Sequence, residues 1–392
     1  MRYPVIPIKE FARLQSGYAF KSHDWSKTGI PVVRIKNIKD GQLDLSDCAY
    51  VSEAVASAAD RYKIACGDIL FSMTGYIGER AWVGASEWIM LNQRVGRFIF
   101  DQKHSPEINR KYFFYVLGYI PVLQALQNRA HGAAQPNISP SAVGEVSIPL
   151  PPLDSQEKIA AILSTYDDLI ENNTRRIEIL EEMARRLYEE WFVQFRFPGH
   201  EGVEFTDSSL GLIPVGWTVG CLQDVITLQR GFDLPVQHRL AGSVPIISAT
   251  GIGGSHVEAK VKGPGVVTGR SGSIGKVMYV HDDHWPLNTT LWGANYPLGS
   301  TLFAYYVLSS IDLKGFNVGA AVPTLNRNDI HGLPVNIPPK EIVQSFEKVA
   351  EPLHNLTEKL RRKNANLRAQ RDLLLPKLIS GEIDVSAIPM PT

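Results

Sequence analysis

The chain has 392 residues, with 40 Lys and Arg against 40 Asp and Glu, and a formal net charge of zero. Its length allows two or three domains, and its charge gives no overall indication of a nucleic-acid partner. No apolar run is long enough for a membrane span or a secretory signal. The three widely separated cysteines, Cys48, Cys66 and Cys221, argue against a disulfide framework or a zinc cluster, so we expect a cytoplasmic protein.

Residues 1–153 and 218–339 each have the pattern of a small α+β segment. Short runs rich in β-branched residues, separated by Gly, Pro, Asn and Asp, predict strands. These runs fall at 30–38, 68–73 and 94–100 in the first segment and at 244–248, 265–269 and 276–280 in the second. One apolar-rich helix is expected in each segment, at 110–127 and at 300–314.

Residues 154–195 predict one long helix after the proline-rich "PLPP", with Asp154 as its N-cap. Its apolar residues alternate at spacings of three and four, which is the pattern of a coiled-coil seam. The seam consists of Leu163, Tyr166, Ile170, Ile177, Leu180, Ala184, Leu187 and Trp191, with polar Asn173 in one slot. Residues 196–217 are rich in turn formers and are expected to be a linker.

Residues 340–381 predict a second long helix, which Pro352 should divide into a short first helix and a long one. Gly381 is expected to stop it, leaving 382–392 as a C-terminal tail. The expected seam is Ile342, Phe346, Val349, Leu353, Leu356, Leu360, Leu367 and Leu374, with Lys363 and Gln370 as polar slots.

The two long helices carry opposite charge. Residues 154–195 hold ten Asp and Glu against five Lys and Arg, whereas 340–382 hold nine Lys and Arg against six Asp and Glu. Opposite charges favour pairing of these helices with each other over self-pairing. The alternative is that each helix packs on its own globular segment.

The two halves of the chain are an internal repeat with the order of matching stretches preserved. The clearest match is "LQSGY" at 14–18 with "LQRGF" at 228–232. Further matches are 30–33 with 244–247, 72–79 with 270–276, 91–93 with 287–289, 133–138 with 320–325, and 148–159 with 335–346. We infer a tandem duplication with deletions in the second copy.

The stretch "VVTGRSGSIGKV" at 266–277 invites comparison with a phosphate-binding loop. Such a loop needs four residues between its glycines and a Ser or Thr after the lysine. Here five residues separate Gly269 from Gly275, and Val277 follows Lys276. The first copy has Glu79 in place of Lys276, and a carboxylate would repel a phosphate. We interpret the stretch as a structural turn that presents variable side chains.

The chain has no sequence motif of a methyl-donor, dinucleotide or zinc enzyme. The Asn-Pro-Pro-aromatic motif that holds a flipped adenine is absent, as are Gly-x-Ser-x-Gly and His-Glu-x-x-His. The run "HDDH" at 281–284 could hold a metal, but four polar residues on a turn are usually only solvated. We therefore expect no cofactor, no metal and no catalysis by this chain.

Taken in order, these segments resemble the specificity (S) subunit of type I restriction–modification systems over essentially the whole chain. The resemblance rests on "SGYAFKSHDW", "GDILFSMTGYIGERAWVG", "LNQRV", "QPNIS", "IPLPPLDSQEKIA", "STYDDLIENN", "GLIPVGW" and "LISGE". The second copy departs from the family pattern. Its "NIPPKEIVQSF" lacks Pro-Leu-x-x-Gln-x-x-Ile, and its "GRSGSIG" replaces Gly-Asp-Ile-Leu.

The resemblance implies two target recognition domains, 1–153 and 218–339, joined by two antiparallel helices that form a coiled coil with internal pseudo-two-fold symmetry. Each domain would read one half of a split sequence in double-stranded DNA. The expected partners are two modification (methyltransferase) subunits and restriction (translocase/endonuclease) subunits, which bring the methyl donor and ATP. Two unlike readers related in this way predict a bipartite, asymmetric target with half-sites roughly one DNA turn apart.

The expected DNA contacts lie in loops where the copies align but their side chains differ, since Asn, Gln and Arg read base edges while Lys and Ser more often hold phosphates. In the first copy they are Tyr18, Phe20, Lys21, Ser72, Thr74, Tyr76, Asn92, Gln93 and Arg94. In the second they are Arg230, Phe232, Arg270, Ser271, Ser273, Asn288, Thr289 and Thr290.

Two other functions stay open at this point. The first is a coiled-coil adapter whose globular domains bind protein rather than DNA. The second is a self-contained DNA-modifying enzyme, against which the missing cofactor and catalytic motifs argue. Sequence-dependent binding of duplex DNA separates the first from a specificity subunit, and binding of a methyl donor by the isolated chain separates the second.

Overall fold

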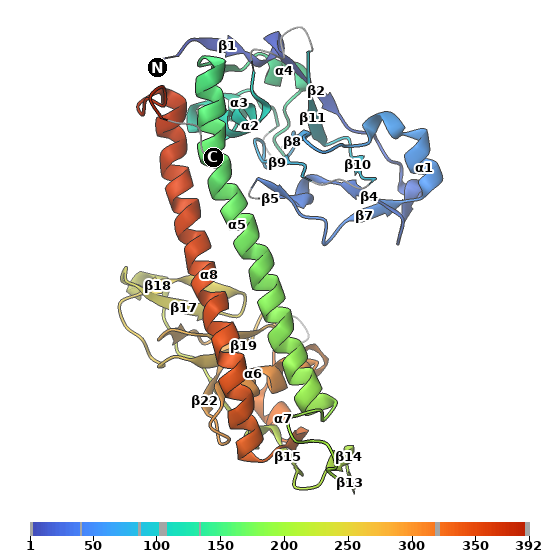
Figure 1. Ribbon diagram of the computed structural model, residues 1–392, viewed down its shortest axis with the longest axis vertical. Coiled ribbons are helices and arrows are strands. Elements are labelled where there is room, and N and C mark those ends of the chain that lie inside the picture. Colours follow the sequence, from blue (N-terminus) through green and yellow to red (C-terminus); the bar gives the residue numbers. More distant parts are fainter. Residues whose placement is uncertain are drawn as a thin grey trace. The chain divides into compact units, whose positions relative to one another are not determined.

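The computed structural model describes residues 3–39, 41–84, 88–101, 108–132, 135–317 and 322–388. It confirms the α+β class: short strands accompany two long helices, α5 (Leu153–Tyr188) and α8 (Lys340–Ser380) (Figure 1). The chain forms two compact units, unit 1 with residues 1–171 and 364–392 and unit 2 with residues 172–363. Each long helix therefore contributes one part to each unit. No helix within the described ranges combines the length and apolarity needed to cross a membrane.

In its described residues, unit 1 contains two four-stranded sheets and four short α-helices. The first sheet is antiparallel, in the order β2 (Ala12–Ser16), β11 (Val95–Phe100), β8 (Ile69–Ser72), β9 (Arg80–Trp82). The second has the order β10 (Met90–Leu91), β4 (Ile30–Val33), β7 (Ala49–Val51), β3 (Trp25–Ser26), with β4 and β10 parallel. Two strand pairs complete it: β1 (Val5–Pro7) with β12 (Ser147–Pro149), and β5 (Ile38–Lys39) with β6 (Gln42–Leu43).

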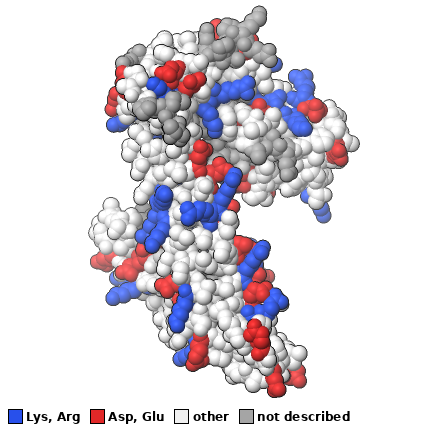
Figure 2. Space-filling view, in the orientation of Figure 1, with Lys and Arg blue, Asp and Glu red and all other residues white. Residues whose placement is uncertain are grey.

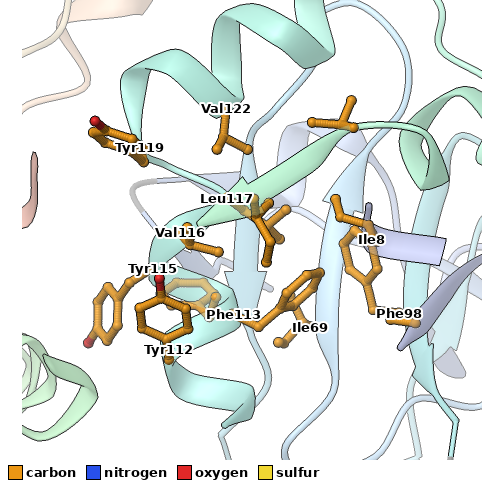
Figure 3. Packing of buried hydrophobic residues seen from close by; sticks show 14 of the residues in the cluster. Ile8, Ile69, Phe98, Tyr112, Phe113, Tyr115, Val116, Leu117, Tyr119 and Val122 are labelled. Carbon is orange, nitrogen blue, oxygen red and sulfur yellow. The ribbon is translucent and has the colours of Figure 1, made fainter. Parts of the chain in front are cut away.

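The core of unit 1 packs the first sheet against helices α2 (Arg110–Val116) and α3 (Ile120–Gln127) (Figure 3). The rings of Phe98 and Phe113 meet edge to face with centroids 4.8 Å apart. Both long helices enter this core, because it also contains Ile159, Leu163, Leu375, Leu378 and Ile379. The other two short helices are α1 (Glu53–Ala58), which packs in a separate cluster through Ala56, and α4 (Pro140–Gly144), which adds Val143 to this core.

The expectation of one helix over 110–127 is wrong, because α2 and α3 are separate. Pro121 lies in the first turn of α3. In an uninterrupted helix its ring would clash with the carbonyl of Leu117, and its missing N–H would leave that carbonyl unpaired. The chain instead turns extended at Tyr119 and starts a new helix there.

Unit 2 repeats the topology of unit 1, as the duplication predicted. Its antiparallel sheet has the order β16 (Thr227–Arg230), β22 (Thr290–Asn295), β19 (Gly265–Gly269), β20 (Val277–Val280). A smaller sheet has the order β18 (Gly251–His256), β17 (Val244–Ser248), β21 (Trp285–Pro286), with β17 and β21 parallel as β4 and β10 are. Unit 2 also contains β15 (Thr218–Cys221) paired with β23 (Pro334–Ile337), and the helices α6 (Thr301–Ser310) and α7 (Arg327–His331).

The segment 196–217 is not a featureless linker. It contains the hairpin β13 (Phe205–Ser208) and β14 (Gly211–Pro214), with the left-handed Gly211 at its turn. Trp217, which follows the hairpin, is buried against Phe192 and Phe197 in the core of unit 2. The hairpin is thus attached to that core.

The predicted seam of α5 is confirmed, since none of its residues is exposed, and the helix continues into a π-helical turn at Glu189–Val193. On α8 the prediction is right for Ile342, which packs against the core of unit 2, and from Phe346 onward for alternate slots only. Phe346, Leu353, Leu360, Leu367 and Leu374 are at least half-buried, but Val349 and Leu356 are exposed. The intervening inward slots are one residue later, at Val343, Ala350, Thr357, Asn364 and Arg371. Three of these five residues are polar, which is why apolar spacing chose the wrong neighbour.

Within each unit the two long helices run in opposite directions and join through opposite charges. In unit 1 Arg371 pairs with Asp167 at 2.5 Å. Lys158 on α5 also donates to the main-chain carbonyl of Ser386, in the segment that follows α8. In unit 2 Arg361 pairs with Glu181. Each long helix also packs on the globular segments. The helices therefore pair with each other and pack on the globular segments at the same time.

The expected break at Pro352 is wrong, since α8 runs unbroken through this residue. Ala350 and Leu353, which flank it, pack in the core of unit 2 and hold the helix together there. A proline inside a helix costs roughly 3 kcal/mol relative to alanine. We therefore expect Pro352→Ala to raise the free energy of unfolding by ~1–3 kcal/mol, measured by urea denaturation. Lys359→Ala on the same helix should leave it within about 0.5 kcal/mol; an equal or lower stability of the proline variant would contradict this.

His354 on α8 predicts a pH dependence of stability. It lies among the rings of Tyr279, Tyr305 and Tyr306, with its Nε2 2.8 Å from the Tyr306 hydroxyl. Burial lowers the pKa of His354 to about 4, and the positive charges of His281 and Arg361 add to this. Because the unfolded value is about 6.5, stability is lost as pH falls from about 6.5 toward 4.

The His354→Asn variant should therefore lose less stability than wild type across that window, measured by thermal unfolding at a series of pH values. Glu347, whose pKa burial raises to about 7, gives the opposite trend in both proteins. The difference between the two curves isolates His354, and curves that stay parallel from pH 7 to pH 4 would exclude this role.

Candidate nucleic-acid interface

In unit 1 four segments that are far apart in sequence meet beyond the ends of the first sheet, joined by main-chain hydrogen bonds. The N–H of Tyr18, just after β2, donates to the carbonyl of Leu91 at 2.8 Å. The N–H of Met73, in the glycine turn after β8, donates to Arg94 at 3.2 Å. The N–H of Gly75 donates to Pro136 at 2.9 Å, which brings in the fourth segment.

In unit 2 the equivalent segments meet in the same way. The N–H of Phe232 donates to Pro286 at 2.8 Å, that of Arg270 to Thr289 at 2.8 Å, and that of Gly272 to Pro323 at 2.9 Å. The predicted loops are therefore brought together in both units by one backbone framework. Residues 133–134 and 320–321 of the repeat lie outside the described residues.

One part of the sequence alignment is wrong by a residue. The "Leu-Asn" pairs at 91–92 and 287–288 are identical in sequence, but they do not make equivalent main-chain hydrogen bonds. The main-chain N–H groups of Gln93 and Asn288 both donate to the carbonyl of the aromatic residue after the first strand, which is Tyr18 in unit 1 and Phe232 in unit 2. Gln93 is therefore equivalent to Asn288, and Arg94 to Thr289.

The shared "Leu-Gln-x-Gly-aromatic" motif is explained by a close backbone approach. A Cβ on Gly17 would lie 2.3 Å from the carbonyl oxygen of Asn92, and one on Gly231 would lie 2.2 Å from that of Leu287. Real Cβ atoms do not approach oxygen so closely, so only glycine allows these segments to cross.

Five of the predicted contact residues have buried side chains or hydroxyls, and all of them except Thr289, whose hydroxyl has no hydrogen-bond partner, support the loops. Phe20 packs between Tyr18 and Trp25, and the hydroxyls of Ser72, Thr74 and Thr290 bond to neighbouring chain atoms. These five are Phe20, Ser72, Thr74, Thr289 and Thr290. Sequence could not separate them from their exposed neighbours, because all lie in the same turns.

The other predicted residues are exposed or half-buried. In unit 1 they are Tyr18, Lys21, Tyr76, Asn92, Gln93 and Arg94, and in unit 2 Arg230, Phe232, Arg270, Ser271, Ser273 and Asn288. Tyr76 is 79% exposed at the tip of its turn, between Gly75 and Gly78, whose positive φ values set the turn. Its equivalent in unit 2 is Ser273, so the two turns present different chemistry.

In unit 2 four polar side chains form a connected group, which we name the Arg230–Arg270 cluster: Arg230, Asp233, Arg270 and Asn288. The Asp233 carboxylate lies 3.5 Å from the Arg230 guanidinium and accepts a hydrogen bond from the side-chain amide of Asn288. The Arg270 guanidinium donates to the main-chain carbonyl of Asn288 at 3.3 Å. These contacts join three loops into one polar surface.

Lys276 has a structural role. Its ammonium donates to the carbonyl of Thr250 at 2.9 Å and so ties the glycine turn to the β17–β18 hairpin. The run 281–284 is likewise engaged within the fold rather than merely solvated. His284 is fully buried, Asp282 pairs with Arg362, and Asp283 accepts from the N–H of Gly263.

Similarity to known proteins covers both units. A model of the type I restriction modification DNA specificity domain matches residues 3–182 and 214–368. The chain belongs to this family.

Two relatives show how far the likeness extends. The MjaIX specificity subunit of Methanocaldococcus jannaschii is 29% identical over 303 residues, covering 71% of this chain and 70% of the relative. The EcoBI specificity subunit of Escherichia coli is 23% identical, covering 98% and 90% respectively. The fold matches the crystal structure of an S subunit from M. genitalium with a TM-score of 0.63 and 17% identity, over 97% of this chain and 96% of that one.

The formal net charge of this specificity subunit is zero, with 40 basic and 40 acidic residues. On the face shown in Figure 2, basic and acidic side chains are interspersed and do not gather into one field.

Sequence reasoning missed Asp233 and Asn137. Asn137 takes the Thr74 hydroxyl at 2.7 Å, and Asp233 links Arg230 to Asn288. Asn137 lies in a stretch that the repeat matched, so it could have been noticed. Asp233 has Ala19 as its equivalent, so the repeat gave no signal for it.

The close approach at Gly231 predicts a selective defect. Gly231→Ala forces the segment after β16 away from Leu287 and disrupts the Arg230–Arg270 cluster. We expect specific DNA affinity, measured with the modification subunit present, to fall by about one to two orders of magnitude, as for one or two lost base contacts. Gly332→Ala is the control, because a Cβ there meets nothing within 4 Å. Equal affinity of the two variants would argue against the crossing as part of the interface.

Proposed function

We propose that this specificity subunit reads a bipartite, asymmetric DNA sequence, with one half-site for each unit. The observation that supports this most directly is that both units build the same loop framework and place different side chains on it. A constant framework with variable exposed groups is what two readers of different sequences require.

The exposed groups differ in their chemistry. Unit 1 offers an aromatic ring at Tyr76 together with Gln93 and Arg94, whereas unit 2 offers Arg230, Arg270 and Asn288. Arg pairs with guanine O6 and N7, and Asn or Gln with adenine, in the major groove. The proposed half-sites therefore differ in sequence.

We further propose that the chain is non-catalytic and acts in the cytoplasm within a complex. Two modification subunits would methylate adenine, and restriction subunits would supply ATP-driven translocation and cleavage. Helices α5 and α8, with 36 and 41 residues, support a spacer role because a helix rises ~1.5 Å per residue. A rigid spacer would keep the half-sites about one DNA turn apart.

Arg270→Ala tests this function. With the modification subunit present, we expect binding to the specific site to weaken by ~1–3 kcal/mol and the preference at one base position to relax. Genome-wide mapping of methylated adenines in cells expressing both subunits gives the motif directly. Arg176→Ala, an equal change of charge at an exposed position on α5, should leave the motif unchanged.

Three results would oppose the proposal. An unchanged motif in the Arg270 variant would remove this residue from the reader. Binding of duplex DNA that depends on salt but not on sequence would favour an adapter. Methyl transfer by the isolated chain would show an enzyme.

A further inference from the structure

Asn288 is held by a group that can only accept hydrogen bonds. Asp233 pairs with the Arg230 guanidinium, and the carboxylate of such an ion pair offers only acceptor oxygens. The Asn288 atom that faces Asp233 must therefore be the amide nitrogen. This fixes one of the two orientations that an asparagine side chain otherwise exchanges freely.

The fixed orientation determines what Asn288 offers to a ligand. One amide proton points to Asp233, while the carbonyl Oδ1 and the second proton remain for other partners. The Asn288 side chain is half-buried. The main-chain carbonyl of Asn288 already accepts a hydrogen bond from Arg270, and this bond holds the loop in place. Asn288 therefore presents an acceptor in a defined place, instead of either an acceptor or a donor.

We propose that Asp233 is a positioning residue for specificity, which makes Asn288 select a base with an exocyclic amino group. In the major groove that group is adenine N6 or cytosine N4, and adenine fits best because its N7 can accept the second amide proton. Guanine O6 and thymine O4 are acceptors and would face Oδ1 without a proton between them. This inference rests on the proposed function of unit 2 as a DNA reader.

Unit 1 lacks this arrangement. The residue equivalent to Asp233 is Ala19, and Gln93 takes the place of Asn288. The restriction on amide orientation is therefore particular to the half-site that unit 2 reads.

The test uses the full chain with its modification subunit and maps methylated adenines genome-wide. In wild type, one position of the half-site of unit 2 should be an amino base, and Asn288→Ala should lose the preference there. Asp233→Asn replaces the carboxylate by an amide of the same shape that can face either end of Asn288. The ratio of amino to keto bases at that position should then fall by about tenfold, the scale of one base contact.

The exchange Asp233→Asn with Asn288→Asp in one protein gives the sharper result. The amide now at position 233 can donate to the carboxylate now at position 288, and this carboxylate presents an acceptor to the base where Oδ1 of Asn288 did, without the second amide proton. The double variant should therefore recover the amino preference that Asp233→Asn loses. Asp207→Asn on the β13–β14 hairpin is the control, because it removes one exposed carboxylate on a separate sheet.

Each outcome decides the matter. A wild-type motif retained by Asp233→Asn, a keto base at the affected position in wild type, or a uniform loss of methylation that the exchange does not restore would overturn the role of Asp233. A wild-type complex that methylates no defined sequence would instead reject the proposed function itself, and this inference with it.

Discussion

The close crossing of main chains at Gly17 and Gly231 is the constraint on which the two readers depend. With hydrogen for a side chain, each glycine lets the segment after the first strand lie against the loop that precedes β11 or β22. The same main-chain hydrogen bonds then fix the glycine turn and the segments at 136–138 and 323–325. Because these bonds involve no side chains, the exposed residues can vary without loss of the framework.

The long helices form part of each unit's core. Leu163 and Leu378 are buried with the strands of unit 1, while Tyr188 and Phe346 are buried with those of unit 2. Both helices must therefore be folded for either core to be complete. The inward slots also carry polar groups, such as Asn364, whose side-chain amide donates to the carbonyl of Ile170. A buried polar contact of this kind specifies the alignment of two helices at some cost in stability.

The sequence predicts the class, the duplication and the first seam, because these depend on periodicity that packing preserves. The sequence-based prediction fails where a shift of one residue changes which face of a helix points inward, or where a single residue determines whether a helix is broken. Val349 and Leu356 match an apolar spacing but are exposed, because the inward slots after them hold Ala350 and the polar Thr357. Further along, Asn364 and Arg371 point inward to partners that lie far away in sequence, Ile170 and Asp167. Pro352 also misleads, since core contacts on both sides outweigh its local cost. In the site, the loops were predictable but the division into buried Ser72 and exposed Tyr76 was not, because both belong to one turn.

The two readers differ in how firmly their polar groups are held, and this bears on how each rejects a wrong base. A side chain with a free amide can turn to suit an acceptor or a donor, so it loses little when the base changes. In unit 2 the amide of Asn288 is held by Asp233 and the main chain of Asn288 by Arg270. In the reading role proposed for Asn288, a wrong base would leave an acceptor facing an acceptor. Discrimination then comes from the cost of an unpaired group as much as from the right contact.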